Sequence, residues 1–162
     1  MSILAAAKKV SEHANAFVEE NESMGRLHDE VVKAMQQSEL PQMLKPDSNY
    51  SIREFIEVCG TLGEGCMSAG WCNFVWGMHN YLIGLYPKAV QSEVWDNTKT
   101  LISASLNPQG TCSYSSNAET ATINGHWTFN SGCDHADWLL LGCRQKEDEP
   151  VLALLHKSEY QI

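Results

Sequence analysis

The residues best suited to chemistry gather in one stretch, Trp127 to Trp138, which reads W-T-F-N-S-G-C-D-H-A-D-W. This stretch combines two Trp and one Phe with one Ser, one Cys, two Asp and one His. Flat rings beside hydrogen-bonding groups are typical of a wall that binds a flat aromatic cofactor or substrate. The alternative is a hairpin whose rings belong to the core and whose polar residues form the turn.

The neighbouring residues Cys133, Asp134 and His135 are candidates for a nucleophile, an acid or a base. Asp134 and His135 are adjacent, so in a turn they face different ways, which favours structural hydrogen bonding over acid–base catalysis. Cys133 has no evident base beside it and is interpreted as a small structural thiol. No Cys-x-x-Cys or His-x-x-x-His spacing occurs, so no metal site is expected.

A second candidate group lies earlier in the chain, where Trp71 and His79 are separated by a little over two helical turns. A histidine among apolar residues must find a hydrogen-bond partner when it is buried. From residue type alone, a satisfied core histidine is favoured over a binding residue by about two to one.

Composition excludes several functional classes. The 162 residues contain 11 basic and 20 acidic side chains, and the net charge of −9 argues against a protein that follows nucleic-acid phosphates. Six scattered cysteines without a preceding signal segment indicate a reducing, cytoplasmic setting. The apolar stretch 71–86 is interrupted by Asn73, His79, Asn80 and Gly84, so we expect a buried helix and no membrane association.

The hydrophobic period changes after Asn97, which predicts two segregated parts. Apolar residues recur every three or four positions over 2–20, 27–35, 51–62, 67–85 and 87–95, and Ser51 with Glu54 predicts a capping box. Short strands are predicted over 101–105, 120–123, 126–129, 138–142 and 151–155. The fold class is therefore α+β, with an all-α domain over 1–97 and a small antiparallel β-domain over 98–162.

The run INGHWTFNSGCDHADWLLLG, residues 123–142, resembles the middle β-domain of the oxygenase components of two-component flavin-dependent monooxygenases. These proteins share the acyl-CoA dehydrogenase fold, and the resemblance extends back over nearly the entire chain. It implies an N-terminal helical domain plus the start of the β-domain, without the C-terminal helical bundle of the family.

The resemblance also implies roles for individual residues. It places the Ser131 hydroxyl beside flavin N5 and Phe129 at a neighbouring flavin position. Ser105 falls in the segment beside the flavin pyrimidine and the phenol side of the pocket. Trp71 and His79 match residues that line the aromatic-substrate pocket, which reverses the preference for a core histidine. Ser131 and His79 are the expected catalytic residues.

The function that the resemblance implies is hydroxylation of a small aromatic substrate with O2 and reduced flavin, either FMN or FAD. A separate flavin reductase would deliver the flavin, and the full-length form would be a homo-oligomer. The isolated chain is expected not to retain flavin, because the opposite wall and the phosphate contacts belong to the missing bundle.

Two other functions stay open. One is an acyl-CoA dehydrogenase-type flavin oxidoreductase, which Leu106-Asn107 weakens because dehydrogenases usually carry Thr-Glu-Pro-Gly there. The other is a non-catalytic truncated remnant or interaction module, which the early stop at Ile162 favours.

Overall fold

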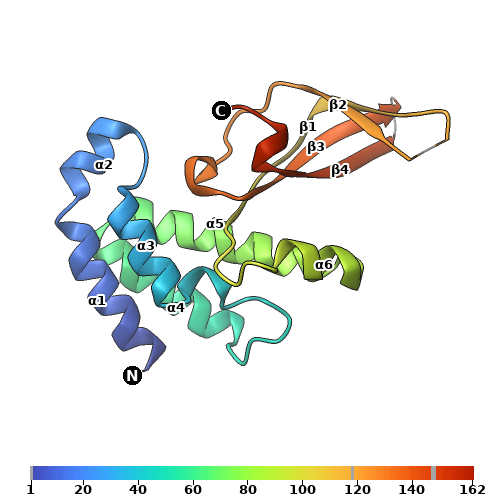
Figure 1. Cartoon of the computed structure of the whole chain (residues 1–162). Coiled ribbons are helices and arrows are strands. Elements are labelled where there is room, and N and C mark those ends of the chain that lie inside the picture. Colours follow the sequence, from blue (N-terminus) through green and yellow to red (C-terminus); the bar gives the residue numbers. More distant parts are fainter. Residues whose placement is uncertain (1, 118, 147–148) are drawn as a thin grey trace. The chain divides into compact units, whose positions relative to one another are not determined.

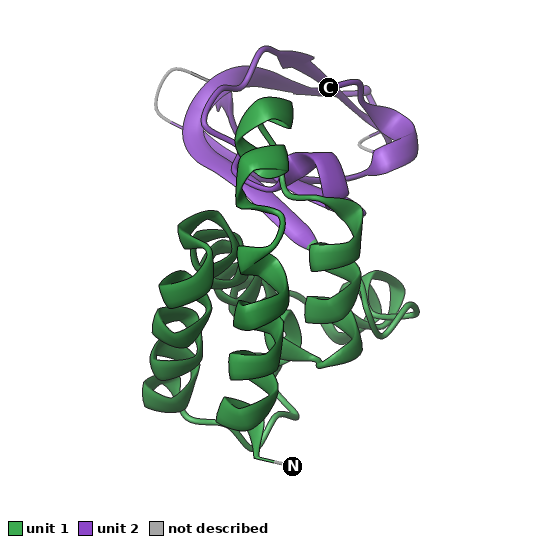
Figure 2. Cartoon of the chain, turned by 90° about the vertical axis from the view of Figure 1, so that its left-hand side faces the viewer, with its two compact units in different colours: residues 1–101 green, residues 102–162 purple. Residues whose placement is uncertain are grey.

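The structure, a computed structural model, describes residues 2–117, 119–146 and 149–162. It divides into two compact units, residues 1–101 and 102–162 (Figure 2). The first unit contains the helices and the second contains a sheet, which confirms the predicted α+β class (Figure 1). The break falls after Leu101, against an expected domain boundary at residue 97.

The described helices of the first unit follow the predicted order with one correction. They are α1 (Ile3–Asn15), α2 (Val18–Met24), α3 (Asp29–Gln37), the 3-10 turn η1 (Leu40–Gln42), α4 (Ile52–Gly65), α5 (Met67–Ile83) and α6 (Lys88–Val94). The single helix expected over 2–20 is wrong, because Phe17 leaves helical geometry between α1 and α2. Its ring stacks on His28 at 4.4 Å and meets the edge of His13 at 5.1 Å, which fixes the bend.

Local signals set the beginning of α4 as predicted. Ser51 accepts a hydrogen bond from the Glu54 backbone N–H at 3.2 Å, and the Glu54 carboxylate accepts one from Ser51 N at 2.8 Å. Each bond satisfies a backbone donor that the first helical turn cannot pair. The predicted capping box is confirmed.

The core of the first unit forms around α5. Trp76 and Phe55 are fully buried, and Gly77 leaves the space that the Phe55 ring fills. Asn80 is also fully buried, and it donates to Pro41 O at 2.9 Å and accepts from Trp95 Nε1 at 2.8 Å. Asn80 therefore connects α5 to η1 and to the end of α6. No helix in the described part of the chain is long and apolar enough to cross a membrane.

The second unit contains a mixed sheet in the order β2-β1-β3-β4. Its described strands are β1 (Ile102–Tyr114), β2 (Ala121–Gly125), β3 (Trp138–Lys146) and β4 (Glu149–His156). β1 pairs antiparallel with β2, as β3 does with β4, but β1 and β3 run parallel. The prediction of an entirely antiparallel sheet is wrong here, because β2 and a long loop return the chain to the starting end of β1, as a parallel pair requires.

The segment 126–129, predicted to be a strand, is an irregular loop. Phe129 has a φ of 59°, in the left-handed region that interrupts an extended ladder. The alternation of apolar residues in this segment therefore has another origin, which is the docking of Trp127 on the sheet.

The Trp127 ring packs against the backbone of strands β1, β2 and β3. Gly110 of β1 is paired with Gly125 of β2, and a Cβ added to Gly125 would lie 2.8 Å from Cη2 of the Trp127 ring. The Trp127 Nε1–H donates to Gly142 O of β3 at 2.7 Å. Because glycines leave this surface flat, the indole can lie on it and begin the loop at a fixed point.

Substituting Gly110 with Ala should destabilise the second unit, because the new methyl group would overlap the Trp127 ring. We expect a loss of about 1–3 kcal/mol in the free energy of unfolding, measured by denaturant titration. Gly60→Ala in α4 is the control, because no atom lies within 4 Å of its added Cβ. A Gly110→Ala protein as stable as the wild type would contradict the proposed packing.

Candidate functional site

The structure distributes the expected site residues over the two units. Ser105, Phe129 and Ser131 belong to the second unit, whereas Trp71 and His79 belong to α5 of the first. Each group is therefore described within its own unit.

Side chains of β1 fix the backbone on both sides of Phe129. Before it, Thr128 O accepts from Ser105 Oγ at 3.0 Å, and Thr128 N donates to Gln109 Oε1 at 2.9 Å. After it, Ser103 Oγ lies 2.5 Å from Asn130 Oδ1 and 2.7 Å from Ser131 O. The buried hydroxyls of Ser103 and Ser105 thus hold the loop against the strand.

Phe129 is the exposed point of this loop. Its side chain is 94% exposed, and its φ of 59° is unfavourable for a residue other than glycine. Such a conformation persists only where the surroundings impose it, and here the flanking hydrogen bonds do so. The loop therefore presents a positioned aromatic ring to solvent, with half-buried Ser131 two residues further on.

This arrangement fits one face of a flat heteroaromatic group. An aromatic ring stacks on such a group, and a hydroxyl and backbone amides in the same loop satisfy its nitrogen and oxygen atoms. The residues that would hold a flavin ring from this side are Phe129 and Ser131, supported by Ser103 and Ser105.

The role that the resemblance gives Ser105, beside the flavin, stays a prediction, and sequence reasoning missed the supporting role of Ser103, Gln109 and Asn130. The available signal was the pair Ser103 and Ser105, two residues apart in an otherwise apolar strand. Side chains two residues apart lie on one face of a strand, so two buried hydroxyls there require acceptors from a neighbouring segment. Local patterning does not indicate which segment supplies these acceptors.

On α5, Trp71 and His79 differ in exposure. Trp71 is 53% exposed and stacks on Phe74, with ring centroids 5.8 Å apart, whereas His79 is only 8% exposed. Eight residues correspond to about 80° around a helix, which accounts for the difference. The helix therefore offers an exposed aromatic ring at one point and a buried imidazole two turns further on.

The short 3-10 turn η2 (Cys133–His135) follows Gly132, whose φ is 76°. Burial is the main factor that raises the pKa of the Cys133 thiol, and the charge of Asp134 adds to it. Cys133 is therefore protonated at neutral pH and is a poor nucleophile. Within the described residues, no group of three or more His, Cys, Asp or Glu side chains could hold a metal ion.

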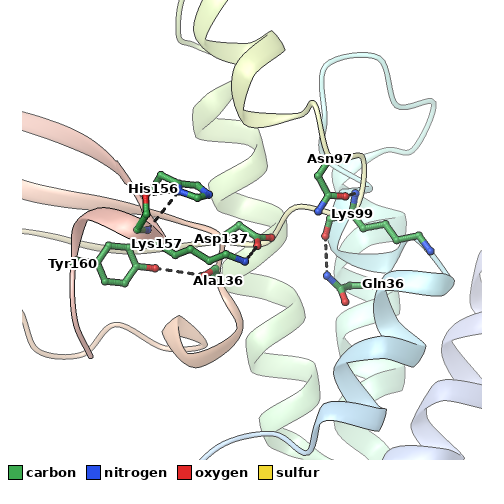
Figure 3. Close-up of polar contacts among 9 residues, drawn as sticks. Gln36, Asn97, Lys99, Ala136, Asp137, His156, Lys157 and Tyr160 are labelled. Atoms are coloured by element: carbon green, nitrogen blue, oxygen red, sulfur yellow. Dashed lines mark hydrogen bonds and ion pairs between the residues drawn. The ribbon is translucent and has the colours of Figure 1, made fainter.

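Contacts from the end of the described chain hold the segment after η2 (Figure 3). Lys157 Nζ pairs with Asp137 at 2.7 Å, and Tyr160 OH donates to Ala136 O at 3.4 Å. Burial, followed by the charges of Cys133 and Asp137, raises the pKa of Tyr160 to about 12. Tyr160 packs with Trp127 and Leu155 on the cluster of Ala136, Leu139 and Leu141.

Comparison with known proteins gives a consistent set of relatives. The chain is 32% identical over 170 residues to the oxygenase subunit HsaA of a flavin-dependent monooxygenase from Mycobacterium tuberculosis. It is 32% identical over 119 residues to the oxygenase component of an FADH2-dependent resorcinol hydroxylase from a Rhizobium species. The crystal structure of the M. tuberculosis HsaA monooxygenase superposes with a TM-score of 0.89 at 31% identity, over 99% of this chain.

These matches cover the chain more fully than they cover the relatives. The HsaA alignment includes 99% of this chain but 43% of the relative, and the resorcinol hydroxylase alignment includes 67% and 28%. The matched part of the HsaA crystal structure is 44% of that chain. No family model matches the sequence.

Removing the Ser103 hydroxyl should loosen the loop around Phe129. In Ser103→Ala, Asn130 Oδ1 and Ser131 O lose the one hydroxyl donor that they share, and we expect a loss of about 1–3 kcal/mol in the free energy of unfolding. Hydrogen exchange should accelerate in residues 128–132. Ser113→Ala, at an exposed position on the same strand, is the control. Unchanged exchange in Ser103→Ala would show that this hydroxyl does not hold the loop.

The raised pKa of Tyr160 predicts a specific alkaline transition. An unfolded tyrosine loses its proton near pH 10 and Tyr160 in the folded chain near pH 12, so its stabilising contribution is complete below about pH 10 and disappears as the pH approaches about 12. Tyr160→Phe should lack this part of the alkaline loss of stability. In an ultraviolet titration, the Tyr160→Phe protein should lack the phenolate step near pH 12 that the wild type shows. If the substitution instead removed a step near pH 10, burial would not raise the pKa of Tyr160.

Proposed function

We propose that this chain, which belongs to the family of flavin-dependent monooxygenase oxygenase subunits, forms part of an oxygenase that hydroxylates a small aromatic compound with reduced flavin and O2. The observation that supports this function best is Phe129, an aromatic ring that is 94% exposed on a backbone fixed from both sides. Covering this ring would remove apolar surface from water, and a flat ring system is the ligand that we assign to it.

Within this proposal the loop residues hold and orient the flavin. Phe129 stacks on the ring system, and the Ser131 hydroxyl faces N5. Ser105 does not contact the flavin in this proposal. Its Oγ donates to Thr128 O and so holds the loop that would lie next to the flavin ring. When bound, the reduced flavin supplies the electrons that activate O2, and the loop keeps water away from one face.

We assign the aromatic substrate to the side of α5. Trp71 offers an exposed ring for stacking, and buried His79 offers an imidazole to the substrate hydroxyl or to the residues that shape the pocket. The resorcinol hydroxylase among the relatives makes a small phenol the first substrate to test.

The flavin and the partners follow from the same relatives. Because that hydroxylase is named as FADH2-dependent, reduced FAD is the first flavin to test, with reduced FMN as the alternative. The designation of both relatives as an oxygenase subunit or component supports a separate flavin reductase as the partner. We also propose a cytoplasmic homo-oligomer in which the two compact units are separate domains.

The decisive experiment supplies the full-length form of the oxygenase with reduced FAD, O2 and resorcinol and measures both hydroxylated product and hydrogen peroxide. Loss of one hydrogen bond near N5 is worth about 1–3 kcal/mol, so Ser131→Ala should release about tenfold more peroxide per product. His79→Ala should chiefly raise KM for the aromatic compound or lower its hydroxylation. Ser113→Ala should behave as the wild type. Unchanged peroxide and product in Ser131→Ala would remove Ser131 from the site.

A further inference from the structure

The first unit contains a pocket that the proposed oxygenase site does not use. Its volume is about 330 Å³, and it lies among the loop 45–47, helix α6 and the segment that follows this helix. Two lysines, Lys45 and Lys88, line it together with the ring of Trp95. The whole chain has a net charge of −9, whereas this small pocket has two ammonium groups, so its charge differs in sign from that of the chain as a whole.

Lys45 is held in place without a carboxylate partner. Its Nζ donates to Thr98 O at 3.0 Å and lies 5.4 Å from the centroid of the Trp95 ring. The ion pairs among the described residues do not include it. Burial is the largest influence on the pKa of Lys45 and lowers it, while the charges of Asp47 and Glu39 act in the opposite direction. The ammonium is thus partly desolvated, and a bound anion would stabilise its charge.

Lys88 reaches the same pocket from the first turn of α6. Its Nζ donates to Gln91 Oε1 at 3.0 Å. The Gln91 amide is itself fixed, because Nε2 donates to Gly84 O at 3.0 Å and to Tyr86 O at 2.7 Å. Both ammonium groups are therefore positioned before any ligand arrives, which lowers the entropic cost of binding.

We propose that this pocket binds the phosphate group of a small phosphorylated molecule, with Lys45 and Lys88 as its two cationic contacts. Each ammonium has three N–H donors and uses one on the protein, so two remain on each for phosphate oxygens. A dianion matches the two lysines in charge, and with two cationic groups against the one carboxylate of Asp47 the lining of the pocket favours an anion. The Trp95 ring offers an apolar wall to the organic part of the ligand.

The pocket shares no residue with the proposed oxygenase site, because its lining belongs to the first unit and none of it is assigned to the flavin ring or to the aromatic substrate. The phosphate could come from a flavin nucleotide or from another phosphorylated compound. Comparing FMN with riboflavin separates these two sources. Tighter binding of FMN that disappears in Lys88→Gln assigns the phosphate to the flavin, whereas equal binding of the two assigns it to another compound.

Calorimetric titration with inorganic phosphate and pyrophosphate tests the site directly. Lys45→Gln and Lys88→Gln should each weaken binding by about tenfold or more, since each removes a charge-assisted contact. Lys33→Gln is the matched control, because Lys33 is exposed and lies 3.8 Å from Glu30. Equal affinity in all four proteins, or no saturable binding up to about 10 mM in the wild type, would overturn the proposal.

A second measurement uses only the wild-type chain and so avoids any effect of substitution on folding. Lysines are acetylated with and without phosphate, and the extent at each position is read by mass spectrometry. Phosphate should protect Lys45 and Lys88 severalfold and leave Lys33 unaffected. Labelling of Lys45 and Lys88 that phosphate does not change would show that the pocket does not bind it.

Discussion

The hydrogen bonds from Ser103 and Ser105 to the backbone oxygens of Thr128 and Ser131 and to the Asn130 side chain are the interactions on which the candidate site depends. Both hydroxyls are buried on β1, so leaving them unpaired would cost about 1–3 kcal/mol each. The loop supplies their acceptors, and in return its backbone is held on both sides of Phe129. Without this pairing, the unfavourable φ of Phe129 would relax and the ring would lose its position.

The sheet makes this pairing possible through its mixed topology. β1 pairs in parallel with β3 over 102–105 and again at Gly110 and Thr111, and over 110–114 it pairs antiparallel with β2. The register between β1 and β3 shifts between Ser105 and Gly110, and Gly142 faces the backbone of Leu106 and Asn107 there without a side chain in the way. Trp127 closes the same region by donating to Gly142 O. The register shift between Ser105 and Gly110 therefore determines where the loop that follows Trp127 begins.

Sequence reasoning predicted the elements whose cause is local and failed where the cause is distant. The capping box of Ser51 and Glu54 lies within one helical turn, and the helical periodicity of α5 lies within one element, so both were predictable. The strand predicted over 126–129 is wrong, since its aromatic alternation arises from the docking of Trp127 on three glycines that come from three strands. The parallel pairing of β1 with β3 depends on the path of the whole loop, which period-2 patterning does not encode.

The same distinction applies to the site. The resemblance predicts that Phe129 and Ser131 face a ligand, but the residues that hold their loop, Ser103 and Gln109, lie about twenty or more positions earlier in the chain. The exposed ring of Phe129 has a thermodynamic consequence for any ligand that covers it. Covering a Phe side chain contributes about 1.5–3 kcal/mol when it is complete, and less when only one face is covered. Because the loop is already ordered, this contribution is not reduced by the entropy of fixing the backbone. A flat ligand would therefore gain affinity from a wall that the fold has already stabilised.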